Sequence, residues 1–97
     1  MEGFDRSKAA FIITTHADEV CKKLSDNFEN GITMINAKGY YSDSSKTMIY
    51  FVVNRFYVWK MKSIVHSIDP KAYIAINEVT DVYPANLEEE NNEEENT

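Results

Sequence analysis

The spacing of apolar residues changes from one segment to the next, and the order of these spacings limits the fold more than any other feature. Four segments carry runs of β-branched and aromatic residues typical of strands: residues 9–15, 32–41, 46–54 and 71–83. Residues 15–31 and 55–68 instead repeat apolar residues at the spacing of a helix that packs on one side. The order strand, helix, strand, strand, helix, strand predicts an α+β ferredoxin-like βαββαβ sandwich. Its two helices would cover one face of a four-stranded antiparallel sheet.

Both predicted helices have residues at their ends that favour a helix boundary. Thr15 and Asp18 have the spacing of a capping box at the first helix. Gly31 follows this helix where a left-handed residue often ends one. Asn54 stands where it can cap the second helix, and Pro70 ends that helix.

The charge divides the chain into a near-neutral body and an acidic end. Of 16 acidic residues, six are glutamates within residues 88–95, so the rest balance the 10 basic residues. A neutral body argues against nucleic acid as a partner, because nucleic-acid-binding domains show a basic face. We expect residues 1–8 to be a linker, residues 9–84 the folded domain and residues 85–97 a disordered acidic tail.

The residue types used in catalysis are few and scattered. Cys21 lies on the apolar stripe of the first helix, so we interpret it as a core residue rather than a nucleophile. His16 and His66 have no partner at a spacing that suggests a triad, and with Cys21 they do not have the spacing of metal ligands. We therefore expect no enzyme activity, no catalytic residue, no metal site and no cofactor.

Residues 46–54 are apolar on both faces of the predicted strand. One face carries Ile49, Phe51 and Val53, and the other carries Met48, Tyr50 and Val52. The second face either meets water on a central strand or is covered by a neighbouring subunit. Because a chain of this length buries only about 60–65% of its unfolded surface, we favour a homo-oligomer, a dimer or trimer, over a monomer.

Residues 38–46 leave two interpretations open. Glycine, serine and aspartate are the ordinary residues of a hairpin turn. The same loop places Lys38 and Lys46 on either side of hydroxyl groups and the two flat rings of Tyr40 and Tyr41. These groups suit a small anionic ligand that contains a ring, such as a nucleotide. Arg55, at the start of the second helix, and Lys71, after Pro70, could each reach a phosphate of a neighbouring subunit, but we favour ordinary surface cations at both positions.

Three stretches resemble a known family: NGITMINAKGYYS, MIYFVVNR and IDPKAYIAI. They are similar to the domain of unknown function DUF2179 at the C-terminus of YitT-type bacterial membrane proteins, over about residues 2–83. The resemblance places the family's turn residues on Gly31, Thr33, Lys38, Gly39, Tyr41 and Ser42. It also places the start of the second helix on Arg55 and a corner before the last strand on Asp69, Pro70 and Ala72.

The resemblance implies a longer natural protein with membrane helices upstream and this domain on the cytoplasmic side. It also implies a fold similar to PII-type regulatory proteins, which are trimers that bind nucleotides in clefts between subunits. We therefore expect a cytosolic regulatory or sensor domain that binds a small anionic ligand at subunit interfaces. A structural oligomerisation domain without a ligand is the alternative. The candidate ligand-binding residues are Gly31, Thr33, Lys38, Gly39, Tyr40, Tyr41, Ser42, Lys46 and Arg55.

Overall fold

The computed structural model describes residues 7–81 and residue 83, and it has the predicted order of elements. The elements are β1 (Ser7–Thr14), α1 (Ala17–Asn27), β2 (Ile32–Lys38), β3 (Ser45–Asn54), the short 3-10 helix η2 (Arg55–Tyr57), α2 (Val58–Ile68) and β4 (Tyr73–Glu78). The strands form one sheet in the order β2-β3-β1-β4, and all three pairs of neighbours are antiparallel. The prediction of a ferredoxin-like α+β fold is confirmed.

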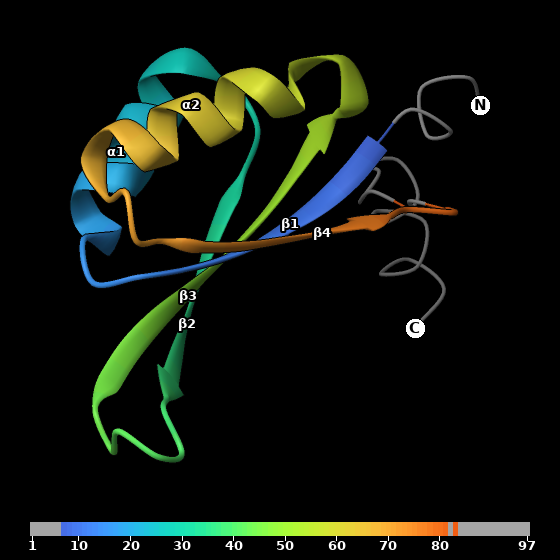
Figure 1. Ribbon diagram of the computed structural model, residues 1–97. Coiled ribbons are helices and arrows are strands. Elements are labelled where there is room, and N and C mark those ends of the chain that lie inside the picture. Colours follow the sequence, from blue (N-terminus) through green and yellow to red (C-terminus); the bar gives the residue numbers. More distant parts are fainter. Residues whose placement is uncertain (1–6, 82, 84–97) are drawn as a thin grey trace, which may run out of the picture.

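Both helices lie on one face of the twisted sheet, which we call the inner face (Figure 1). The predicted apolar stripes point into the core, where Leu24 of α1 and Met61 of α2 are fully buried. Opposite them, Ile12 of β1 pairs with Ile49 of β3, and both are fully buried as well. Alternate residues of two central strands and one stripe of each helix thus close a single core.

The other side of the sheet, which we call the outer face, is also apolar at its centre. Phe11 of β1 lies opposite Tyr50 of β3, and their ring centroids are 5.3 Å apart. The strand registers place these side chains on the outer face: Ala9, Phe11, Ile13, Ile35, Met48, Tyr50, Val52, Tyr73 and Ala75. Both helices lie on the opposite side, so no described helix covers the outer face (Figure 1).

The predicted ends of the first helix were wrong. The helix begins at Ala17, and the Thr15 hydroxyl lies 3.1 Å from His16 Nδ1 instead of capping the helix. The helix ends at Asn27 because Phe28 turns to an extended conformation and packs its ring 5.4 Å from that of Phe51. No described glycine has a positive φ, so Gly31 is not a left-handed stop.

The other boundaries differ less from the prediction. The Asn54 side chain accepts a hydrogen bond of 2.9 Å from the Phe56 amide, which confirms it as a cap, although the first turn is 3-10. β1 begins at Ser7, inside the predicted linker, whereas β2 and β4 are shorter than predicted. Residues 1–6 of that linker and the predicted tail, residues 85–97, lie outside the described part of the chain.

Candidate functional site

The loop between β2 and β3 uses most of its polar groups to hold its own shape. The Gly39 amide donates to the Ser44 carbonyl at 3.1 Å, and the Asp43 amide donates to the Gly39 carbonyl at 2.9 Å. The Lys38 ammonium forms an ion pair of 2.9 Å with Asp43, and the hydroxyls of Ser42 and Ser44 are 2.9 Å apart. Asp43, with φ of 55°, is the residue that takes the left-handed conformation. The geometry is that of a hairpin turn, and it leaves few of these groups for a ligand.

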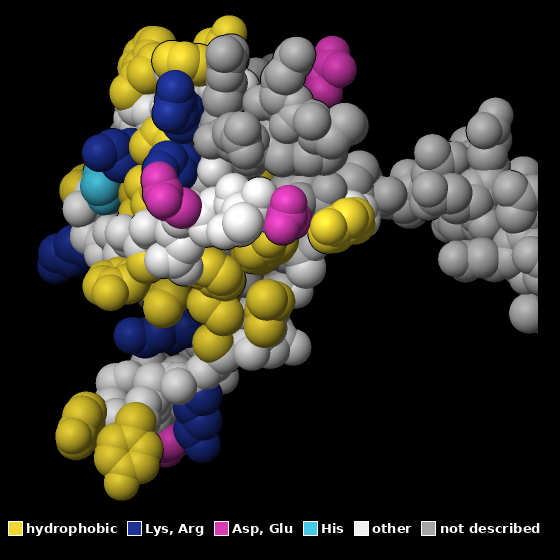
Figure 2. Space-filling view, turned by 90° about the vertical axis from the view of Figure 1, so that its right-hand side faces the viewer, with side chains coloured by type: hydrophobic (Ala, Val, Ile, Leu, Met, Phe, Trp, Pro, Cys, Tyr) yellow, Lys and Arg dark blue, Asp and Glu magenta, His cyan; other side chains and the backbone are white. Residues whose placement is uncertain are grey.

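The two tyrosines of this loop project from the hairpin. Tyr40 is 90% exposed and Tyr41 is 96% exposed, and their rings meet edge to face at 5.0 Å. Figure 2 shows hydrophobic side chains at the lower tip of the molecule, apart from the band of hydrophobic side chains nearer its middle. Neither tyrosine lines any of the three hollows described below.

The predicted ligand-binding residues do not gather at one place within a single chain. Thr33 pairs with Tyr50, and Gly31 precedes it, so both lie toward the far end of the hairpin. Arg55 follows the last residue of β3, whereas Lys46 is near its start. A strand of this length separates the two by roughly 30 Å. Arg55 instead stacks its guanidinium 5.0 Å from the centroid of the Phe56 ring.

Lys46, by contrast, lines a cleft of about 280 Å³ at the end of the sheet, which we call the corner cleft. The cleft lies where β1 turns into α1 and where α2 turns into β4. Its walls are formed by Ile13, Thr14, Thr15, His16, Lys46, Asp69, Lys71 and Tyr73. Three segments that are distant in the sequence therefore contribute to it.

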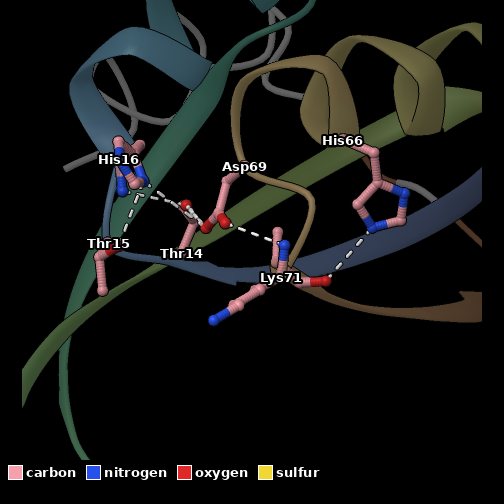
Figure 3. Close-up of polar contacts among 7 residues, drawn as sticks. Thr14, Thr15, His16, His66, Asp69 and Lys71 are labelled. Atoms are coloured by element: carbon pink, nitrogen blue, oxygen red, sulfur yellow. Dashed lines mark hydrogen bonds and ion pairs between the residues drawn. The ribbon is translucent and has the colours of Figure 1, made fainter.

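A buried carboxylate, that of Asp69, lines the corner cleft and makes several polar contacts (Figure 3). Asp69 is 7% exposed, and its Oδ2 accepts a hydrogen bond of 2.6 Å from the Thr14 hydroxyl. Its Oδ1 accepts a bond of 3.0 Å from the Lys71 amide, and His16 Nδ1 lies 3.7 Å from Oδ2. The hydrogen bond from Thr14, helped by the Lys71 amide and His16, holds the pKa of Asp69 below its ordinary value although burial opposes this.

The sequence around Asp69 explains why the carboxylate lies there. A residue before proline is kept out of helical geometry, and Asp69 is extended with φ of −135° and ψ of 94°. The helix therefore ends at Ile68, and the Ala72 amide closes the turn on the Asp69 carbonyl at 3.0 Å. His66 Nε2 lies 3.3 Å from the Ala72 carbonyl and supports the same turn.

The corner cleft has more positive than negative charge. Lys46 and Lys71 both line it, and neither has an ion pair with a carboxylate within the described residues. Asp69 is the one carboxylate among its lining residues. This composition suits an anionic ligand, because two lysines and only one carboxylate, already hydrogen-bonded, line the cleft.

Two other hollows suit an anion less well. One of about 290 Å³ shares Thr15 and His16 with the corner cleft but is lined by the carboxylates of Asp18 and Glu19. A larger one of about 500 Å³ is lined by Phe28, Glu29 and Lys60, among other residues. The Lys60 ammonium lies 5.2 Å from the centroid of the Phe28 ring and is engaged there.

Sequence reasoning placed Lys46 in the candidate site and weighed Lys71 as a phosphate contact, although it favoured an ordinary surface cation there. It did not include Thr14 or His16 in the ligand site. The dipeptide Asp69-Pro70 was a usable signal, because it fixes a corner with an acidic side chain. The sequence does not reveal which residue pairs with that side chain. Thr14 comes beside it only in the folded chain, where β1 lies next to β4.

Comparisons with known proteins agree with the fold and the suspected family. The model of the family described as "Uncharacterized protein conserved in bacteria (DUF2179)" matches residues 30–83, more than half of the chain. A solved DUF2179 protein from Eubacterium ventriosum has a TM-score of 0.64 at 19% identity, over 75% of this chain and 100% of that one.

Two relatives from Bacillus subtilis are described as UPF0750 membrane proteins. YxkD is 30% identical over 86% of this chain, and YpjC is 35% identical over 84% of it. The chain spans only 30% and 28% of their respective lengths. Within its own described residues, neither helix has the length and apolar character needed to cross a bilayer.

Proposed function

The chain belongs to the DUF2179 family of bacterial proteins, and from this premise we propose that it is a regulatory domain of a membrane protein. In this proposal the domain lies on the cytoplasmic side, associates with further copies of itself and responds to a small anionic ligand. We assign it no catalytic step. Membership in a family whose relatives are described as membrane proteins supports the context, and the outer face of the sheet supports the association.

The observation that carries the proposal is the apolar outer face. Its centre is formed by Phe11, Met48, Tyr50 and Val52, which are only half-buried within the chain. Contiguous apolar surface of this kind marks interaction sites in soluble domains. Covering about 500 Å² of apolar surface per subunit would contribute on the order of 10 kcal/mol before the costs of association. A second copy can supply a matching apolar face through two-fold symmetry.

Sedimentation equilibrium of this chain at tens of micromolar tests the association. We expect a dimer or larger species for the unmodified chain and a monomer for Tyr50→Lys, because a charge at the centre of the outer face opposes burial. Ser63→Lys adds the same charge at an exposed position of α2 and serves as the matched control. Circular dichroism checks that both variants are folded. A monomeric unmodified chain would contradict the proposal.

The structural alternative has an observation of its own. The hairpin loop, which was predicted to hold the ligand, satisfies its polar groups internally through Lys38, Asp43 and the backbone of Gly39. A domain that only joins subunits would keep such a loop as a turn. The two functions differ in whether the domain binds an anion, which calorimetric titration with phosphate compounds measures.

A further inference from the structure

We propose that the corner cleft binds a small phosphate ester, with the phosphate held between Lys46 and Lys71. The inference rests on the proposed function, because it names the class of ligand to which the regulatory domain would respond. It also moves the site away from the hairpin loop and onto the junction of β1, β3 and the corner between α2 and β4.

The first step is that no described carboxylate neutralises Lys46 or Lys71. Lys38, at the other side of the hairpin, is neutralised by Asp43 at 2.9 Å, whereas neither Lys46 nor Lys71 has a carboxylate partner among the described residues. Both line the same cleft. Lysine is a common phosphate binder as a point charge, so two such groups around one cavity favour a doubly charged anion.

The second step is the rigidity of the site. Asp69 is held by its bonds to the Thr14 hydroxyl and the Lys71 amide, and no ion pair within the described part of the chain joins it to Lys46 or Lys71. Those bonds fix the backbone from which the Lys71 side chain extends. Figure 3 shows this side chain extending from the turn, below Thr14 and toward the side of Thr15. A side chain that extends from a fixed backbone has less freedom to lose when a ligand binds.

The third step concerns the part of the ligand beyond the phosphate. The ring of Tyr73 is 65% exposed and forms part of the same wall, beside the apolar side chain of Ile13. An exposed aromatic ring gives a flat group of the ligand a surface to stack on. Ligand sites in proteins usually measure about 300–1,000 Å³. The cavity of about 280 Å³ is near the lower end of this range, which favours a small ligand.

The cleft also adjoins the proposed subunit interface. Ile13, Lys46 and Tyr73 are on the outer face by strand register, at one end of it. A second copy packed on this face would come close to the mouth of the cleft. This position agrees with a ligand that is sensed where subunits meet.

Isothermal titration calorimetry at constant ionic strength tests the site, with inorganic phosphate, pyrophosphate and AMP as probes. We expect AMP to bind more tightly than inorganic phosphate. Lys46→Ala and Lys71→Ala should each weaken AMP binding at least about tenfold, because each removes a charge-assisted contact. Lys62→Ala removes an equal charge from an exposed position of α2 and should leave binding unchanged. Tyr73→Ala should weaken AMP but not inorganic phosphate.

The outcomes separate this inference from the proposed function. AMP binding that is unchanged in both Lys46→Ala and Lys71→Ala would overturn the site. The regulatory proposal would then require a ligand site in another part of the domain. No binding of any probe to a chain that still self-associates would overturn the ligand and favour the structural alternative. Vesicles containing phosphatidic acid form a separate arm. Binding to those vesicles without binding to any soluble probe would overturn a soluble ester in favour of a lipid headgroup.

Discussion

The hydroxyl of Thr14 donates a hydrogen bond of 2.6 Å to Oδ2 of Asp69, 55 residues away in the chain. The bond joins the last residue of β1 to the turn between α2 and β4. Thr14 is 3% exposed and Asp69 is 7% exposed, so water does not compete freely for either group. The corner cleft is thus built on a buried contact that only the tertiary fold creates.

Thr14→Val should lower the free energy of unfolding by about 1–3 kcal/mol while keeping the volume, because it removes the hydrogen bond to the buried Asp69 carboxylate and the acceptor of the His16 amide. Urea denaturation of the two proteins measures the difference. Thr15→Val makes the same chemical change at the exposed neighbour and should stay within about 0.5 kcal/mol. Equal losses in the two variants would show that the Asp69 contact contributes little.

Asp69 should also shape the response of stability to acid. Its pKa is lowered in the folded protein, so the stability that it contributes is present above the unfolded value of about 3.9 and is lost as pH falls through the folded pKa. We expect the free energy of unfolding to fall below about pH 4 more steeply in the unmodified chain than in Asp69→Asn. Chemical denaturation from pH 2.5 to pH 6 measures both slopes. If the free energy of unfolding changed with pH in parallel in the two proteins, the lowered pKa of Asp69 would be contradicted.

The sequence predicted those features of the fold that depend on local spacing. The alternation of Ile49 and Phe51 with Met48 and Tyr50 placed the strand and both of its faces, and Asn54 marked the start of the second helix. The capping box failed for a reason that spacing does not reveal. The hydroxyl of Thr14, not that of Thr15, accepts a hydrogen bond of 3.0 Å from the His16 amide.

The candidate site was less accessible to sequence reasoning. Lys38 and Lys46 look equivalent in the sequence, on either side of the same loop. In the fold one is paired with Asp43 and the other lines the corner cleft. Lys71 belongs to that cleft because β4 pairs with β1, a contact between residues far apart in the chain.

The core and the hairpin tip should respond very differently to truncation. Phe51 is fully buried and meets the ring of Phe28 at 5.4 Å, so Phe51→Ala should destabilise the fold by about 3–5 kcal/mol. Tyr41→Ala removes a ring that is 96% exposed and should change stability by less than about 0.5 kcal/mol. Thermal or urea unfolding compares them. A comparable loss for Tyr41→Ala would mean that the tip is covered by a partner subunit.

The thiol of Cys21 should react slowly in the folded protein. Burial, and secondarily the negative charge of Asp18, raises its pKa, and the thiolate is the form that reacts. We expect labelling by Ellman's reagent at pH 8 to be slower in the folded chain than in urea. Asp18→Asn should speed labelling of the folded chain slightly, because it removes the smaller of the two effects. A folded thiol that reacts as fast as the unfolded one would place Cys21 outside the core stripe, contrary to its half-buried position on α1.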